Sequence, residues 1–233
     1  MKIFFEGFYG FKNAGDDAFV EVSSWGAEKY WNCNDNFFSG ASLPETTRKI
    51  KTPNIKINAP GFDRITLLKN LKNTDYFISS GGSTFSKLPI HSNKSLASYY
   101  KLINNNLKLG AIGVSIGPFK NSQEEKKVIK YLKGLSFLSL RDKRSYEYSK
   151  TLNLNYDPVK AFDLAALLPS VFKSSNSTLN ESFTEKKIIG ISICNCESYY
   201  GGDLKKEINR NSYFKELVNL IITKTNAHLK IFI

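Results

Sequence analysis

The sequence has little cysteine and no long apolar run. Its 233 residues include three cysteines. So small and uneven a number cannot form a disulfide framework, which favours a reducing compartment. Cys194 and Cys196 are separated by one residue and have no partner pair elsewhere, so no metal site is predicted. No stretch approaches the roughly 18 to 20 consecutive apolar residues of a membrane span, and no signal-peptide pattern is present. These features predict a cytoplasmic globular protein that carries neither a metal nor a cofactor.

Acidic residues are scarce relative to basic ones. Asp and Glu number 21 against 33 Lys and Arg, which gives a formal net charge of +12. Such an excess indicates an acidic ligand, an anionic membrane surface or a nucleic acid as partner. The basic residues are spread along the whole chain and form no stripe with interleaved aromatic residues, so nucleic-acid binding is not predicted. An acidic ligand and a peripheral contact with the inner face of an anionic membrane remain.

Apolar segments of strand length alternate with segments of helical periodicity in residues 1–168. Strands are predicted at 76–80, 109–116 and 135–140, with shorter extended pieces at 37–38 and 54–58. Helices are predicted at 17–31, 62–71, 92–105 and 123–133, and from Asp142 onward. This alternation is typical of a parallel sheet with helices on both faces. The predicted fold class is α/β, with a Rossmann-like first domain.

The composition changes in residues 169–186, which are rich in Ser, Asn, Thr and Lys and show no sustained periodicity. This segment is predicted to be a linker. Strands at 187–193 and 228–233 and a helix within 205–225 then indicate the start of a second Rossmann-like domain at 187–233. Two strands and a helix do not close a doubly wound core, so we expect this second domain to be truncated.

Polar and glycine-rich residues follow each predicted strand, including the first, which lies at the N-terminus. In an open parallel sheet, ligands bind beyond the carboxyl ends of the strands, so these positions are the candidate binding site. The candidate substrate-binding residues are Asn13, Asp16, Asp17, Gly81, Gly82, Ser83, Gly117 and Arg141.

The turn after the first strand is rich in glycine, but its spacing is not that of a dinucleotide-binding loop. Asp16 is predicted to cap the following helix, and the positive end of that helix also favours Asp17. Two carboxylates at a helix N-terminus repel a pyrophosphate, so the turn is expected to hold a group rich in hydroxyls. The alternative is that Asn13, Asp16 and Asp17 only cap the helix and shape the turn.

Arg141 follows an apolar strand and places a charged fork at the sheet edge. A guanidinium in that position can hold a carboxylate or phosphate in a bidentate manner. The alternative is a salt bridge with Asp142 or another carboxylate. Asp163 is expected either to line the same cleft or to cap the helix that follows it. Gly81 and Gly82 are expected to offer amide donors to a ligand or, alternatively, to form a tight turn.

Five segments, taken in order, resemble the polysaccharide pyruvyl transferase family. They read Gly-Phe-Tyr-Gly-Phe-Lys-Asn-Ala-Gly-Asp-Asp-Ala (7–18), Tyr-Phe-Ile-Ser-Ser-Gly-Gly-Ser (76–83), Gly-Val-Ser-Ile-Gly-Pro (113–118), Leu-Arg-Asp-Lys-Arg-Ser (140–145) and Phe-Asp-Leu-Ala (162–165). The resemblance implies a two-domain fold like that of GT-B glycosyltransferases. It also implies transfer of a pyruvyl group from phosphoenolpyruvate to a sugar of a cell-surface glycan precursor, free or lipid-linked, in capsule, O-antigen or exopolysaccharide assembly.

The same resemblance assigns roles to some of the candidate residues. It implies that Arg141 helps to bind phosphoenolpyruvate and that Asn13, Asp16 and Asp17 line the cleft near the acceptor. The catalytic histidine and a further arginine of the family are expected beyond Ile233, so no catalytic residue is assigned here. Two alternatives stay open: a GT-B glycosyltransferase that uses a nucleotide sugar, and a catalytically inactive remnant that binds a glycan or a partner protein. The two histidines, His91 and His228, are interpreted as surface or structural residues.

Overall fold

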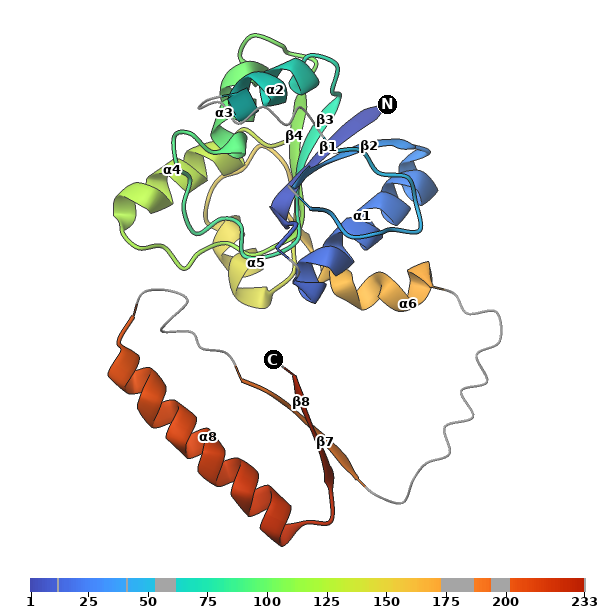
Figure 1. The fold of residues 1–233 in the computed structure, drawn as a ribbon. Helices are drawn as coiled ribbons and strands as arrows, with labels where there is room; N and C mark the ends of the chain where they lie inside the picture. The colour runs from blue at the N-terminus through green and yellow to red at the C-terminus, as the bar shows by residue number, and fades with distance from the viewer. Residues whose placement is uncertain (12, 41, 53–61, 173–186, 194–201, 233) are drawn as a thin grey trace. The chain divides into compact units, whose positions relative to one another are not determined.

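The computed structural model describes residues 1–11, 13–40, 42–52, 62–172, 187–193 and 202–232 (Figure 1). The chain forms two compact units, Met1–Ser174 and Ser175–Ile233. Their division falls in the segment predicted as a linker, whose first residues belong to helix α6 (Leu168–Val171). The extended piece predicted at 54–58 and the two cysteines at 194 and 196 lie outside the described residues. The GT-B-like pairing of two domains stays a prediction.

A six-stranded sheet, parallel throughout, forms the centre of the first unit. Its strands are β1 (Lys2–Tyr9), β2 (Asp35–Gly40), β3 (Tyr76–Ser80), β4 (Lys108–Val114), β5 (Phe137–Leu140) and β6 (Val159–Lys160). Their order is β2-β1-β3-β4-β5-β6, which confirms the predicted Rossmann-like α/β fold. The order reverses at β1, because β2 pairs on one side of it and the later strands extend from the other. Ligands of doubly wound sheets bind at this switch point.

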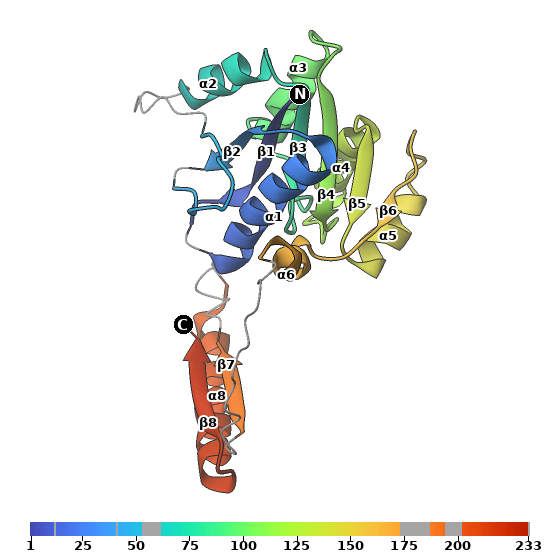
Figure 2. The ribbon, with the colours of Figure 1, turned by 90° about the vertical axis from the view of Figure 1, so that its right-hand side faces the viewer.

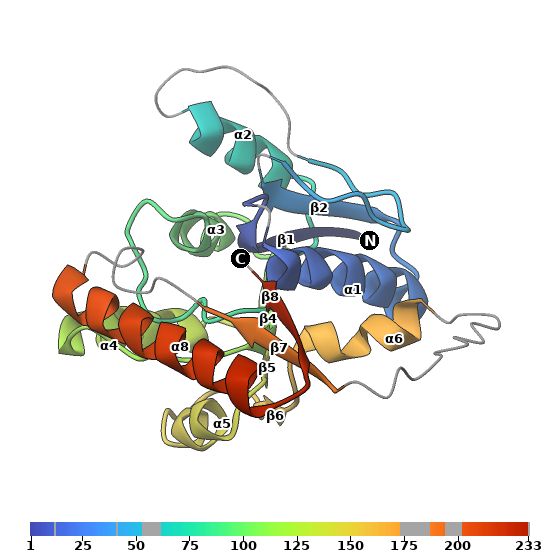
Figure 3. The same ribbon diagram turned by 60° about the horizontal axis from the view of Figure 1, so that its bottom comes forward.

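Helices cover both faces of the sheet (Figures 2 and 3). Helix α1 (Ala14–Trp31) packs with the 3₁₀ helix η1 (Leu164–Leu167) and with α6. Residues of the other four helices join a separate core cluster; those helices are α2 (Phe62–Leu71), α3 (Asn93–Lys101), α4 (Ser122–Lys133) and α5 (Lys143–Lys150). The helices predicted from periodicity are therefore present, with ends displaced by up to four residues.

Side-chain alternation along the strands separates the two hydrophobic cores. Ile3 and Phe5 of β1 pack with Phe19 of α1, whereas Phe4, between them in sequence, packs in the cluster of α2, α3 and α4. Neighbouring residues of a strand point to opposite faces of a sheet. Strands buried on both faces have continuous apolar runs, which is why β1 and β3 are readable in the sequence.

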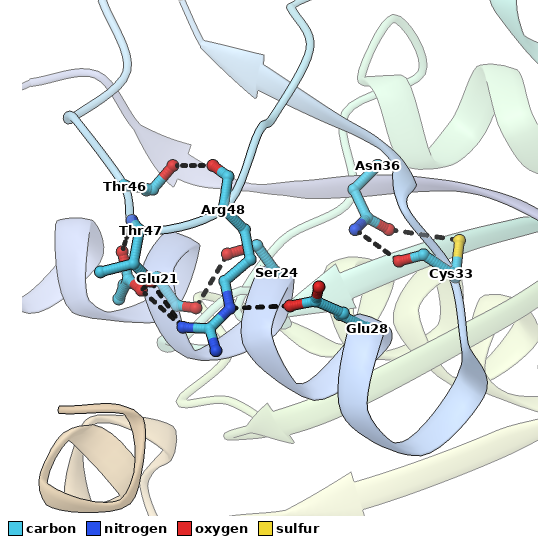
Figure 4. Close-up of polar contacts among 8 residues, drawn as sticks. All are labelled: Glu21, Ser24, Glu28, Cys33, Asn36, Thr46, Thr47 and Arg48. Carbon is cyan, nitrogen blue, oxygen red and sulfur yellow. Dashed lines mark hydrogen bonds and ion pairs between the residues drawn. The ribbon is translucent and has the colours of Figure 1, made fainter. Parts of the chain in front are cut away.

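A buried carboxylate fastens the connection after β2 to helix α1 (Figure 4). Glu21 is 6% exposed and accepts hydrogen bonds from the backbone N–H of Thr47, at 2.9 Å, and from its hydroxyl. The next residue, Arg48, donates from Nε to Glu28 at 2.8 Å and forms an ion pair with Glu21 at 3.6 Å. Burial is tolerable for Glu21 because its charge is both paired and hydrogen-bonded.

The described residues of the second unit form a β-α-β arrangement. Strands β7 (Ile188–Ser192) and β8 (His228–Phe232) pair in parallel, and helix α8 (Leu204–Lys224) connects them in sequence. Of the apolar residues predicted on this helix, Phe214, Val218 and Ile221 are half-buried, while Leu217 and Ile222 are exposed. In the described parts of both units, no helix combines the length and the apolar character required to cross a membrane.

An ion pair lies almost buried between the sheet and α3. Lys94 Nζ lies 2.6 Å from Glu6 Oε2, and the two side chains are only 9% and 13% exposed. The ammonium also lies 5.8 Å from the centre of the Phe85 ring. Because water cannot solvate either charge well at this depth, each charge depends on the other.

We predict that Lys94→Met destabilises the first unit by about 3 kcal/mol, because it leaves the Glu6 carboxylate uncompensated in the interior. The measurement is urea unfolding followed by the fluorescence of Trp25 and Trp31, both of which lie in α1. The double variant Glu6→Met/Lys94→Met should lie within about 1 kcal/mol of the wild type, because it removes both charges. Equal stabilities of the wild type and the single variant would contradict the prediction.

Candidate functional site

The side chain of Arg141 connects the carboxyl ends of four neighbouring strands. Its Nε donates to Ser115 Oγ at 2.9 Å, beyond β4, and its Nη2 donates to Ser83 Oγ at 3.1 Å, beyond β3. Its Nη1 forms an ion pair with Asp163 Oδ2 at 2.5 Å, beyond β6. Arg141 itself directly follows β5, and its side chain is 23% exposed. The fork is thus held at the edge of the sheet and remains partly open to solvent.

The structure confirms the expectation that Asp163 caps the following helix, and it also pairs Asp163 with Arg141. Its Oδ1 accepts a hydrogen bond from Ala165 N at 3.0 Å and caps η1, while Oδ2 pairs with Arg141. The salt bridge anticipated as the alternative for Arg141 is therefore present, with Asp163 as its partner. Asp142, the other carboxylate considered, caps helix α5 instead.

Asp142 and Ser145 hold the end of β5 in place. Asp142 caps α5 by accepting the Ser145 N–H at 2.8 Å, and the Ser145 hydroxyl donates to its second oxygen at 2.7 Å. Burial opposes ionisation of Asp142, but hydrogen bonds from Ser145 and Ser115 and the Arg144 charge together outweigh burial and lower its pKa. Ser145 Oγ also accepts the Ile116 N–H at 2.8 Å, which ties the connection after β4 to α5. The Arg-Asp-x-x-Ser spacing thus orients the backbone at Arg141.

Gly81 and Gly82 form a tight turn after β3, with φ angles of +73° and +76°. A Cβ on Gly81 would lie 2.4 Å from the Phe19 ring of α1, so only glycine fits between strand and helix there. The Gly81 N–H donates to Ile112 O at 2.9 Å, and Gly82 O accepts from Ser115 N at 3.0 Å. The Gly81 amide is therefore used within the fold, and the turn serves to present Ser83 to Arg141.

Gly117 has a different set of contacts from the other candidate residues. Its φ angle is +70°, and its N–H donates to Phe85 O at 2.9 Å, next to the isolated parallel bridge between Phe85 and Ile116. It is buried and is joined to Pro118 by a cis peptide bond. These contacts support the extension of β4 on which Ser115 lies.

Helix α1 begins one residue after Asn13, not at Asp16. Asn13 Oδ1 accepts the Gly15 N–H at 3.0 Å, so Asn13 is the N-cap, and the cap predicted at Asp16 is wrong. Asp16 and Asp17 lie in the first turn, where the helix dipole favours carboxylates. Both side chains are partly exposed, and Asn13 is exposed.

The electrostatics of Asp16 connect this helix end to Arg141. Burial raises the pKa of Asp16, the neighbouring Asp17 carboxylate raises it further, and the Arg141 cation lowers it. Asp16 therefore lies within range of the charge on Arg141. The switch point thus has carboxylates on the β1 side and a guanidinium on the β5 side.

Sequence reasoning missed Ser115 as a member of the site. Its Oγ holds the Nε of Arg141, and the residue is 8% exposed. The available signal was a hydroxyl at the end of an apolar strand, four residues after the buried Ala111.

His91 and His228 are both exposed, and His228 belongs to the second unit. Within the described residues, no cluster of three or more His, Cys, Asp or Glu side chains is arranged to hold a metal ion.

The sequence model of polysaccharide pyruvyl transferases matches residues 11–228. The chain belongs to that family. The match includes the whole Arg141 cluster and the acidic start of α1, and it confirms the resemblance drawn from the sequence motifs. Membership of the polysaccharide pyruvyl transferase family indicates a transferase of polysaccharide biosynthesis with a glycan acceptor. A search among curated proteins found no match.

We predict that Gly81→Ala lowers the free energy of unfolding by about 3 kcal/mol, because it adds both a strained φ and a clash with Phe19. Gly82→Ala is the matched control, since its φ is nearly the same but the nearest atom to a Cβ is 3.7 Å away. That control should cost about 1 kcal/mol from backbone strain alone. Thermal or urea unfolding of the two variants compares them, and equal losses would contradict the role given to Phe19.

Proposed function

We propose that this chain supplies the donor-binding wall of an enzyme that transfers the pyruvyl group of phosphoenolpyruvate to a sugar of a cell-surface glycan precursor. The observation that carries the proposal is the Arg141 guanidinium, positioned at the edge of the sheet by Ser83, Ser115 and Asp163. Membership of the pyruvyl transferase family supports the reaction type.

The hydrogen bonds of Arg141 leave part of the fork for a ligand. A guanidinium carries five N–H groups, and the three contacts with the described residues use one on each nitrogen. One N–H on each terminal nitrogen remains for a carboxylate or phosphate oxygen. The side chain enters binding already ordered, so little rotamer entropy is lost when an anion binds.

The carboxylates on the opposite side of the switch point suit a neutral, hydroxylated acceptor. Asp16 and Asp17 accept hydrogen bonds from hydroxyls and disfavour a second anion beside them. The raised pKa of Asp16 makes its carboxylate a better proton acceptor for a sugar hydroxyl than an ordinary aspartate. We therefore place the acceptor beside α1 and the donor beside Arg141.

The balanced reaction defines what the site must do. Two acceptor hydroxyl oxygens become bonded to C2 of phosphoenolpyruvate, and its C2–O bond to phosphate breaks. One hydroxyl proton ends on the methylene carbon, which becomes a methyl group, and the other leaves with the phosphate. Arg141 stays protonated and orients the anion without moving a proton. The acid that protonates the methylene carbon is a separate group.

The net charge of the chain supports a location for this reaction at the membrane surface. A net charge of +12 attracts both a small multivalent anion and the anionic inner leaflet of a membrane. We therefore propose a cytoplasmic protein in peripheral contact with the membrane, where a lipid-linked acceptor would be presented.

We predict that Arg141→Lys weakens phosphoenolpyruvate binding by about tenfold or more, because lysine keeps the charge but loses the fork. Titration calorimetry at fixed ionic strength measures the dissociation constant. Lys143→Ala is the control: it removes an exposed positive charge two residues away and leaves the fork intact. Its affinity should stay within about twofold of the wild type, as expected for a screened surface charge.

Equal affinities of the wild type and Arg141→Lys would remove Arg141 from the donor site. Binding of a uridine diphosphate sugar at a site from which phosphoenolpyruvate does not displace it, with no phosphoenolpyruvate binding, would favour the nucleotide-sugar alternative.

A further inference from the structure

Two phenylalanine rings are stacked and exposed to solvent at the end of β1. The ring centroids of Phe8 and Phe11 are 4.2 Å apart with an interplanar angle of 16°, and the residues are 49% and 64% exposed. They belong to neither of the two hydrophobic core clusters. Exposing two adjacent aromatic rings costs hydrophobic free energy, so the pair suggests a surface that binds a partner.

The backbone around the pair directs both rings outward. The register between β1 and β2 shifts between Phe5 and Tyr9, and Tyr9 turns inward, where its hydroxyl donates to Ser80 O at 2.7 Å. A Cβ on Gly7 would lie 2.4 Å from the Tyr9 ring. Gly10, with a φ angle of +86°, lies between Tyr9 and Phe11, and Phe11 stacks on Phe8. The buried tyrosine thus anchors the exposed pair.

The aromatic pair closely precedes the carboxylates of the candidate site in the sequence. Asn13 caps α1 two residues after Phe11, and Asp16 and Asp17 follow in the first turn of the helix. Burial chiefly raises the pKa of Tyr9, and the charges of Glu6 and Asp16 raise it further, so Asp16 acts across the turn that carries the two rings. One short segment therefore presents an apolar plane together with oxygen acceptors.

This combination matches the chemistry of a pyranose. A sugar ring has a face of C–H groups and a rim of hydroxyls. The negative face of an aromatic ring attracts C–H groups, and carboxylate oxygens accept hydrogen bonds from hydroxyls. A bilayer fits the segment less well, because Asp16 and Asp17 would be repelled by anionic lipid headgroups.

We propose that Phe8 and Phe11 form the subsite that holds the pyranose ring of the acceptor by its C–H face, while Asp16 and Asp17 receive its hydroxyls. This subsite rests on the proposed function, because it assumes a glycan acceptor at the switch point. It assigns the recognition of the sugar to the turn between β1 and α1 and leaves donor binding to Arg141.

Saturation-transfer NMR on the full chain tests the subsite, with methyl β-galactopyranoside, methyl β-glucopyranoside and methyl α-mannopyranoside as probes. Irradiation of the aromatic protons should give the largest transfer to ring C–H protons of at least one glycoside. The variant Phe8→Leu/Phe11→Leu keeps an apolar surface but loses the aromatic faces, so its dissociation constant should rise about fivefold or more. Phe11→Tyr keeps an aromatic face and should bind as the wild type does.

A matched control and a second ligand separate this subsite from the donor site. Tyr99→Leu removes an aromatic residue that is 55% exposed on α3, and it should leave glycoside binding unchanged. The double leucine variant should bind phosphoenolpyruvate with wild-type affinity, which also shows that it is folded. If phosphoenolpyruvate failed to bind the wild type, an unchanged circular dichroism spectrum would show that the variant is folded, and loss of glycoside binding in it would still support the subsite.

Three results would overturn the subsite. The first is the absence of transfer from the wild type to all three glycosides. The second is equal transfer to the glycosides from the wild type and from the double leucine variant. The third is sedimentation with phosphatidylcholine–phosphatidylglycerol vesicles that is lost in Phe8→Ser/Phe11→Ser while glycoside binding persists, which would assign the rings to a membrane contact.

Discussion

The ion pair and hydrogen bonds of the Arg141 guanidinium are the interactions on which the carboxyl edge of the sheet depends. This one cation donates hydrogen bonds to residues beyond β3, β4 and β6 and so holds together connections that are distant in sequence. Without the guanidinium, Asp163 would lose its ion-pair partner and Asp16 would lose the cation that lowers its pKa. The group proposed to bind the donor anion is therefore also the group that organises the site, which makes its geometry independent of the ligand.

Glycine turns allow the chain to bring these partners together. At Gly81 the strand turns away through a left-handed conformation that L side chains rarely adopt, and the Phe19 ring fills the space where a Cβ would be. The same turn presents Ser83 to Arg141. The Gly81 turn therefore determines both how α1 packs on the sheet and where Ser83 lies. A substitution that moves Phe19 would therefore also move Ser83.

Local patterns predict the elements of this fold well, because buried parallel strands have continuous apolar runs and the helices between them have a clear period. They did not predict the start of α1 correctly. Asn13 and Asp16 are both good N-caps, and the choice of Asn13 depends on where the helix docks on the sheet. Pairings such as that of Arg141 with Asp163 are set by the order of β5 and β6 and by η1, so no local pattern contains them. Ser115 was missed for the same reason.

The distribution of charge along the edge explains how two unlike substrates could be sorted at one switch point. A donor anion is attracted by the guanidinium after β5 and repelled by the two carboxylates after β1. Under the proposed function, a neutral sugar would feel neither effect strongly and would be selected by hydrogen bonds to the carboxylates and by contact with the stacked rings that follow β1. Asp16 is influenced by both charged groups: burial and the Asp17 charge raise its pKa, and the Arg141 charge lowers it. Under the proposed function, Asp16 would meet an acceptor hydroxyl beside the charge that holds the donor, where the bonds from the acceptor oxygens to C2 would form.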